Sequence, residues 1–175
     1  DRAIAYLREH TEVRDVIQDG FGVRVSFSGH DLNGFVLGPD GRIYGTLGDR
    51  GFNIVTKEGV KYEMPDEGCG FRFDPDGTNF EVIHTGLRNP KEIAFDELGN
   101  AISVDNNCDQ GDQARVVYIV DGADSGWNMG HQGLLVHHRQ MGMDERPPAR
   151  WMAEKMWNLE NPSQPAYILP PVAHI

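Results

Sequence analysis

Cysteine is scarce in this sequence, and the two cysteines that it has, Cys69 and Cys108, stand far apart. Neither belongs to a C-x-x-C pair, so the chain carries no zinc ribbon and no C-x-x-C-H haem-attachment motif. Nothing else in the sequence indicates a disulfide framework, and two separate thiols are favoured over a Cys69–Cys108 bond. The sequence therefore gives no sign of a cysteine-based metal or redox centre.

Long apolar runs and positive charge are also lacking. No stretch reaches 18 consecutive apolar residues, so no transmembrane segment is predicted. Lysine and arginine together number 16 against 27 acidic residues, which gives a net charge of −11. Such a field repels phosphate backbones and anionic membrane surfaces, and nucleic acid is therefore excluded as a partner. The acidity suits cation binding, but plain solubility is the favoured interpretation.

Turn residues are abundant instead, with 21 glycines and 10 prolines. Short apolar runs alternate with dipeptides such as Asp-Gly and Gly-Asn, which tolerate the positive φ of tight hairpins. This pattern is typical of antiparallel β-structure. The strands that we expect are 14–18, 35–38, 42–47, 70–73, 80–84, 92–95, 101–104, 115–120 and 126–129.

One phrase occurs twice along the chain. Residues 16–22 read V-I-Q-D-G-F-G and residues 82–88 read V-I-H-T-G-L-R, and each copy runs into a hairpin, at 35–49 and at 93–107. The phrases are 66 residues apart and the hairpins 58, so the first copy carries eight extra residues, and His30 lies among them. Repeated units of about this length are typical of β-propeller blades.

We therefore expect an all-β fold, a partial β-propeller of about two and a half to three four-stranded antiparallel blades from a six-bladed ring. A β-sandwich is the competing interpretation, and the similarity of the two units favours the propeller. Residues 1–175 would form a single fragment. It would contain the end of a preceding blade at 13–34, blade units at 35–84 and 92–129, and an irregular segment at 130–175.

Connections in such a meander alternate between the two ends of the sheet. The tight turns 39–41, 74–77 and 98–100 would lie at one end, and the longer connections 19–34, 48–69, 85–91 and 105–114 at the other. The long connections hold the side chains that could do chemistry, so this parity predicts one functional face. Its members are His30, Asp31, Asn33, Asp49, Arg50, Arg88, Asn89, Asp105, Asn106, Asn107, Asp109 and Asp112.

The sequence from His30 to Asp49 (H-D-L-N-G-F-V-L-G-P-D-G-R-I-Y-G-T-L-G-D), the G-L-R-N-P at 86–90 and the D-S-G-W-N at 124–128 carry a resemblance. They resemble the six-bladed quinoprotein glucose and sorbosone dehydrogenases, which use pyrroloquinoline quinone (PQQ). The chain is also similar to a bacterial branch named for a membrane-bound dehydrogenase, some of whose members carry a fused c-type haem domain.

The resemblance implies that His30 is the general base and that Asp49 holds its imidazole. A neutral imidazole can accept the proton of a hydroxyl group, and a carboxylate on its other nitrogen fixes the tautomer. It also implies that Arg88 and Asn89 bind PQQ, since a guanidinium offers a planar fork to carboxylates.

The same family binds calcium through a Gly-Pro turn, and this sequence departs from that pattern. It reads S-V-D-N-N-C-D-Q-G-D at 103–112, where Asp105, Asn106 and Asn107 offer oxygen ligands instead. Asn33-Gly34 also stands where the family tends to have Gly-Arg. An EF-hand calcium loop starting at Asp105 is excluded, because neither its glycine nor its last acidic ligand would stand at the required position.

The resemblance thus implies a periplasmic or otherwise exported oxidoreductase that acts on a sugar or alcohol, with a cytochrome c as a candidate electron acceptor. Two alternatives stay open. One is a non-catalytic propeller that binds carbohydrate or protein, and the other is a calcium-dependent hydrolase of the lactonase kind.

Overall fold

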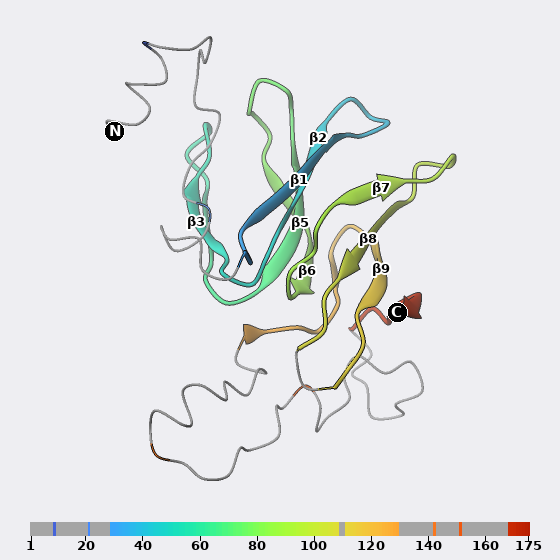
Figure 1. The fold of residues 1–175 in the computed structure, drawn as a ribbon. Coiled ribbons are helices and arrows are strands. Elements are labelled where there is room, and N and C mark those ends of the chain that lie inside the picture. Colours follow the sequence, from blue (N-terminus) through green and yellow to red (C-terminus); the bar gives the residue numbers. More distant parts are fainter. Residues whose placement is uncertain are drawn as a thin grey trace.

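The structure is a computed structural model, and it describes residues 9, 21, 29–108, 111–129, 142, 151 and 168–175. Within these residues every named element is a strand (Figure 1). The strands are β1 (Leu32–Leu37), β2 (Ile43–Leu47), β3 (Phe52–Val55), β4 (Lys61–Met64), β5 (Gly68–Phe73), β6 (Glu81–Leu87), β7 (Ile93–Phe95), β8 (Ala101–Asp105), β9 (Arg115–Ile119), β10 (Ala123–Asp124) and β11 (Ala173–His174).

The first sheet has the order β1-β2-β5-β6-β10. Its first four strands are antiparallel neighbours and correspond to the predicted strands 35–38, 42–47, 70–73 and 80–84, with ends that differ by up to three residues. The two tight turns close as the sequence predicts: Gly41 N donates to Gly38 O (3.0 Å) and Gly77 N to Asp74 O (2.7 Å). The outer strand β6 also pairs with β10 in parallel.

The second sheet has the order β11-β9-β8-β7. The predicted strands 92–95, 101–104 and 115–120 are confirmed as β7, β8 and β9. The expected fourth strand at 126–129 is wrong: Gly126 has a φ of 85°, and Trp127 N donates to Gly86 O (2.9 Å) of the first sheet. The fourth strand is β11, where Ala173 pairs with Val116.

One further hairpin was not predicted. The long connection between β2 and β5 contains β3 and β4, with Phe52 opposite Met64 and Ile54 opposite Tyr62. At the base of this hairpin Gly51 has a φ of 62°, and a Cβ there would lie 1.7 Å from the Met64 carbonyl oxygen. Only glycine allows the chain to pass so close to β4.

Two apolar cores hold these layers together. The first lies between the two sheets, and the second between the first sheet and the β3–β4 hairpin. The first core contains Tyr44, Ile83, Leu87, Ile93, Ala101, Val117 and Ile119, and the second contains Leu47, Phe52, Ile54, Cys69, Phe71, Phe73 and Phe80.

Both cysteines are buried free thiols and do not form a disulfide with each other.

Apart from the parallel pair of β6 and β10, each sheet is antiparallel, and the chain passes from β6, the last of the four antiparallel strands of the first sheet, to the edge strand β7 of the second (Figure 1). Consecutive blades of a β-propeller are connected in this way. The fold is therefore all-β and a partial propeller, as predicted. The segments 14–18, most of 13–34 and most of 130–175 lie outside the described residues. Within the described part, no helix is long and apolar enough to cross a membrane.

Candidate functional site

The long connections meet at one end of the two sheets, as the parity of the meander predicts. Asp49 N, just after β2, donates to Arg88 O (2.7 Å), just after β6, and Gly48 N donates to Asp31 O (3.0 Å). A Cβ on Gly48 would lie 2.6 Å from the His30 carbonyl, so the backbone after β2 passes directly under His30. We call this end of the sheets the crossing end. The tight turns 38–42, 74–80, 96–100 and 120–123 form the hairpin end.

His30 and Asp49 form a direct pair at the crossing end. His30 Nδ1 lies 2.8 Å from Asp49 Oδ1, and the two residues are 8% and 1% exposed. The second carboxylate oxygen, Oδ2, accepts a hydrogen bond from Trp127 Nε1 (3.0 Å). An ionised carboxylate only accepts hydrogen bonds, so this contact places a proton on Nδ1, and in the neutral form of the ring Nε2 is the basic nitrogen.

Arg88 is 3% exposed and its guanidinium is already engaged. Nη1 donates to the Asn107 carbonyl, and the guanidinium carbon lies 5.6 Å from the centre of the Trp127 ring. Trp151 packs edge-on against Trp127, with 5.2 Å between ring centres. The arginine thus belongs to a packed cluster, in which the face of the indole attracts the guanidinium.

Asn89 and Pro90 lie in the connection from β6 to β7 and attach it to the first sheet beside β1. The Asn89 amide faces Gly29 O with its nitrogen (3.3 Å) and Lys91 Nζ with its oxygen (3.0 Å). The Pro90 carbonyl accepts from Asn33 Nδ2 (3.2 Å) and from Thr46 Oγ1 (3.1 Å). The segment that the sequence singled out therefore lies beside His30, and its polar groups bridge the two sheets.

Asp105, at the end of β8, is 1% exposed and is surrounded by donors. Oδ1 accepts from Asn89 N (2.7 Å), both oxygens lie 3.0 Å from Arg88 N, and Oδ2 accepts from Arg115 Nη2 (2.8 Å) and Nε (3.1 Å). These bonds fix the backbone of residues 88 and 89 against the second sheet. A buried carboxylate with this many partners has a structural role, because removing it would leave several buried donors unpaired.

Two of the predicted calcium ligands, Asp105 and Asn107, are hydrogen-bonded to other groups of the protein. Asn107 Nδ2 donates to Asp112 O (3.0 Å), and the Asp112 carboxylate accepts from Cys108 N (2.9 and 3.0 Å). Among the residues that the structure describes, no group of three or more His, Cys, Asp and Glu side chains is arranged to hold a metal. The assignment of Asp105, Asn106 and Asn107 to calcium stays a prediction.

Sequence reasoning missed two residues that organise the crossing end, Trp127 and Arg115. Arg115, at the start of β9, donates to Asp105, to Ser125 O (2.6 Å) and to Gly86 O (2.9 Å). Gly86 has a φ of 73°, and a Cβ there would lie 2.0 Å from Asp124 Oδ1. The D-S-G-W-N match at 124–128 was the one available signal, because it contains the segment that packs on Gly86.

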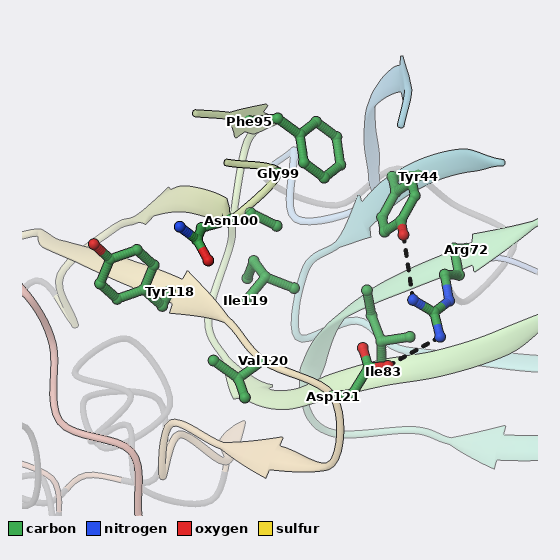
Figure 2. Close-up of a pocket in the computed structure, with 11 residues that line it drawn as sticks. Tyr44, Arg72, Ile83, Phe95, Gly99, Asn100, Tyr118, Ile119, Val120 and Asp121 are labelled. Carbon is green, nitrogen blue, oxygen red and sulfur yellow. Dashed lines mark hydrogen bonds and ion pairs between the residues drawn. The ribbon is translucent and has the colours of Figure 1, made fainter. Parts of the chain in front are cut away.

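The hairpin end carries a separate crevice, shown in Figure 2. Its volume is about 490 Å³, and it opens between the sheets beside Tyr44, Arg72, Phe95, Tyr118 and Asp121. The Arg72 guanidinium donates to Tyr44 Oη (3.2 Å) and to Asp121 Oδ2 (2.9 Å). Three polar side chains of this crevice, Tyr44, Arg72 and Asp121, are therefore joined by hydrogen bonds.

The comparisons with known proteins assign a family. A domain family described as "Domain of unknown function (DUF7133)" matches residues 8–147. The chain belongs to this family. A comparison with curated proteins finds no match. Among solved structures the chain is similar to the PQQ-bound form of an aldose sugar dehydrogenase from Streptomyces coelicolor, with 18% identity and a TM-score of 0.49. The match covers 82% of this chain and 36% of that one, so the DUF7133 chain spans about a third of that dehydrogenase's length.

Proposed function

We propose that this DUF7133 chain forms part of a dehydrogenase-type propeller that oxidises a sugar or another alcohol, with His30 as the general base and PQQ as the hydride acceptor that the sequence resemblance implies. The observation that carries the proposal is the buried His30–Asp49 pair, whose Nδ1–Oδ1 distance is 2.8 Å. A buried imidazole oriented by a carboxylate is the arrangement that proton abstraction from a hydroxyl group requires.

In this proposal Asp49 holds the imidazole with its Nδ1–H bonded to Oδ1, and His30 Nε2 takes the proton of the substrate hydroxyl. The imidazolium that forms is stabilised by the carboxylate, which is itself buried. Low exposure at the pair also strengthens this electrostatic support, because few waters compete for it.

The cofactor assignment meets a structural obstacle at Arg88. A tricarboxylated quinone needs a guanidinium that faces it, whereas Arg88 is directed onto Asn107 and Trp127. The space that Arg88, Arg115, Trp127 and Trp151 line has no room for a water molecule. Binding of PQQ at Arg88 and Asn89 would therefore require the guanidinium to leave the Trp127 ring.

Dye reduction by the intact protein tests the proposal. With PQQ and Ca²⁺ added, a panel of sugars and alcohols should give turnover, and His30→Ala should lower kcat/KM by about 100-fold or more, the usual contribution of a general base. Asp121→Asn at the hairpin end is the control, with unchanged turnover. Turnover that survives His30→Ala would refute the role of His30.

The closed Arg88 cluster is the observation that favours the alternative of a non-catalytic propeller. In that case PQQ would not bind, no substrate would be oxidised, and a carbohydrate or protein would bind instead. Lactone hydrolysis that depends on Ca²⁺ but not on quinone would favour the hydrolase.

A further inference from the structure

Both carboxylate oxygens of Asp49 are hydrogen-bonded to side chains. Oδ1 is hydrogen-bonded to His30. Oδ2 accepts a hydrogen bond of 3.0 Å from Nε1 of Trp127, which lies 78 positions away in the sequence. Asp49 and Trp127 are 1% and 2% exposed, so water does not replace either bond. With one donor on each oxygen, the carboxylate has a single favourable rotation about its Cβ–Cγ bond.

The backbone before Trp127 is itself held in place. Trp127 N donates to Gly86 O (2.9 Å) and Ser125 N to Thr85 O (3.0 Å), so this segment follows β6. Gly126 has a φ of 85°, and a Cβ there would meet Ile168 at 2.8 Å. An indole has a single N–H donor, and the fixed backbone limits the directions in which it can point.

The faces of the indole are fixed as well. The Arg88 guanidinium lies over the ring, and Trp151 packs edge-on against it. Arg88 O in turn accepts from Asp49 N at 2.7 Å. Arg88, Trp127 and Asp49 therefore form a closed loop of contacts, and the hydrogen bond to Asp49 attaches His30 to it.

We propose that Trp127 is the positioning residue of the His30–Asp49 pair: its N–H holds the carboxylate in the one rotation that orients the imidazole with Nδ1–H inward. Arg88 acts in the same assembly by packing on the indole. The inference deepens the proposed function and rests on it for its functional meaning. Trp127 acts through Asp49 and touches no reacting atom.

The test is NMR of the His30 ring in the intact protein, with the Nδ1 proton assigned from its absence in His30→Gln. In Trp127→Phe the exchange of this proton with water should become at least about tenfold faster, because a hydrogen bond to a charged group is lost. The matched control is Trp151→Phe, which removes an indole from the same cluster but keeps an aromatic ring against Trp127, and it should change the His30 exchange rate much less than Trp127→Phe does.

A second replacement excludes misfolding as the explanation. Benzothienylalanine at position 127 keeps the shape of the indole and removes only the N–H, and it should reproduce the faster exchange. An unchanged His30 signal in this protein, or an equal change in Trp151→Phe, would overturn the proposal.

The two proposals fail separately. If the unmodified protein turns over no substrate, the proposed dehydrogenase function fails and the exchange measurement still decides the role of Trp127. If turnover depends on His30 but the exchange rate does not depend on the Trp127 N–H, the positioning role fails alone. Where turnover is present, loss of the N–H should lower kcat with little change in KM, a split that general destabilisation does not produce.

Discussion

The two ends of the sheets contain the same kinds of groups in opposite environments. At the crossing end Asp105 pairs with Arg115, and their side chains are 0% and 4% exposed. At the hairpin end Arg72 pairs with Glu81 and Asp121, whose side chains are 41% and 64% exposed. Charges that lie in water cost little to leave unpaired, whereas buried charges cost several kcal/mol. The crossing end therefore depends on complete pairing, and the hairpin end does not.

The pKa values at the hairpin end show how water moderates its charges. Burial alone would raise the pKa of Glu81, but hydrogen bonds from Arg72 and Arg42 outweigh it and the net shift is downward. Arg72 and Asp121 line the crevice at this end, and Figure 2 shows the ion pair between them. This end is built like an ordinary protein surface. The difference between the ends can be measured by removing comparable groups from each.

The largest expected effect is the loss of Asp105. Asp105→Asn weakens the bonds to Arg88 N and Asn89 N and leaves the buried Arg115 guanidinium without its carboxylate. Breaking a buried pair by removing one partner costs about 3–5 kcal/mol of unfolding free energy. Asp121→Asn, the matched change at the hairpin end, should cost less than about 1 kcal/mol. Urea unfolding of both variants measures the contrast, and equal losses would contradict it.

The second effect concerns pH and comes from His84. Burial is the main cause that lowers the pKa of His84 to about 4, and Arg115 lowers it further. Nδ1 accepts from Val120 N (3.2 Å) and Nε2 lies 2.8 Å from Ser125 Oγ, an arrangement that requires the neutral ring. Between pH 6.5 and 4 the unfolded chain therefore binds a proton that the folded chain does not, so stability should fall as the pH falls through this window.

The size of this loss approaches ~3 kcal/mol at full titration, since each pKa unit corresponds to about 1.4 kcal/mol. Urea unfolding at pH 7, 5.5 and 4.5 measures it. A His84→Gln protein keeps an amide for Ser125 and cannot titrate at this position. The difference in unfolding free energy between the two proteins should therefore change with pH below 6.5 and stay constant above it. A parallel pH dependence in both proteins would assign the loss to other groups.

The sequence predicted local structure well because strands and tight turns depend on neighbours. Short apolar runs and turn dipeptides predicted seven of the strands, whereas Phe52–Val55 and Lys61–Met64 were treated as parts of one long connection. The pairing of His30 with Asp49 was found through resemblance. Trp127 was not found as a partner, because nothing local relates it to a carboxylate 78 residues away.

The same limit explains the incorrect strand at 126–129. The local sequence allows a strand, but the contacts of Trp127 with Gly86 and of Asp124 with Thr85 direct the segment to the first sheet. The fourth strand of the second sheet then comes from Ala173–His174, about fifty residues later. Such pairings are set by which faces remain to be covered, and the order of residues does not encode them locally.

A smaller contrast is expected from two glycines with similar backbone angles. Gly86 at the crossing end has a φ of 73° and Gly41 at the hairpin end has a φ of 81°. Alanine at Gly41 would meet nothing within 4 Å, so it should cost only the left-handed strain of about 1 kcal/mol. Alanine at Gly86 adds a clash with Asp124 and Gly126 and should cost about 1–2 kcal/mol more. Thermal unfolding of the two variants measures the difference, and equal melting temperatures would show that the Asp124 segment shifts freely.

The smallest effect is expected for the ion pair between Arg72 and Asp121. Its oxygen lies 2.9 Å from Arg72 Nη2, but the Asp121 side chain is mostly in water and Arg72 has Glu81 as a second carboxylate. A double-mutant cycle with Arg72→Gln and Asp121→Asn should give a coupling energy below about 1 kcal/mol. Because salt screens exposed charges, the coupling should shrink further in 1 M NaCl. A coupling that is large and insensitive to salt would mean that the hairpin end is as dry as the crossing end, and the contrast between the two ends would then be lost.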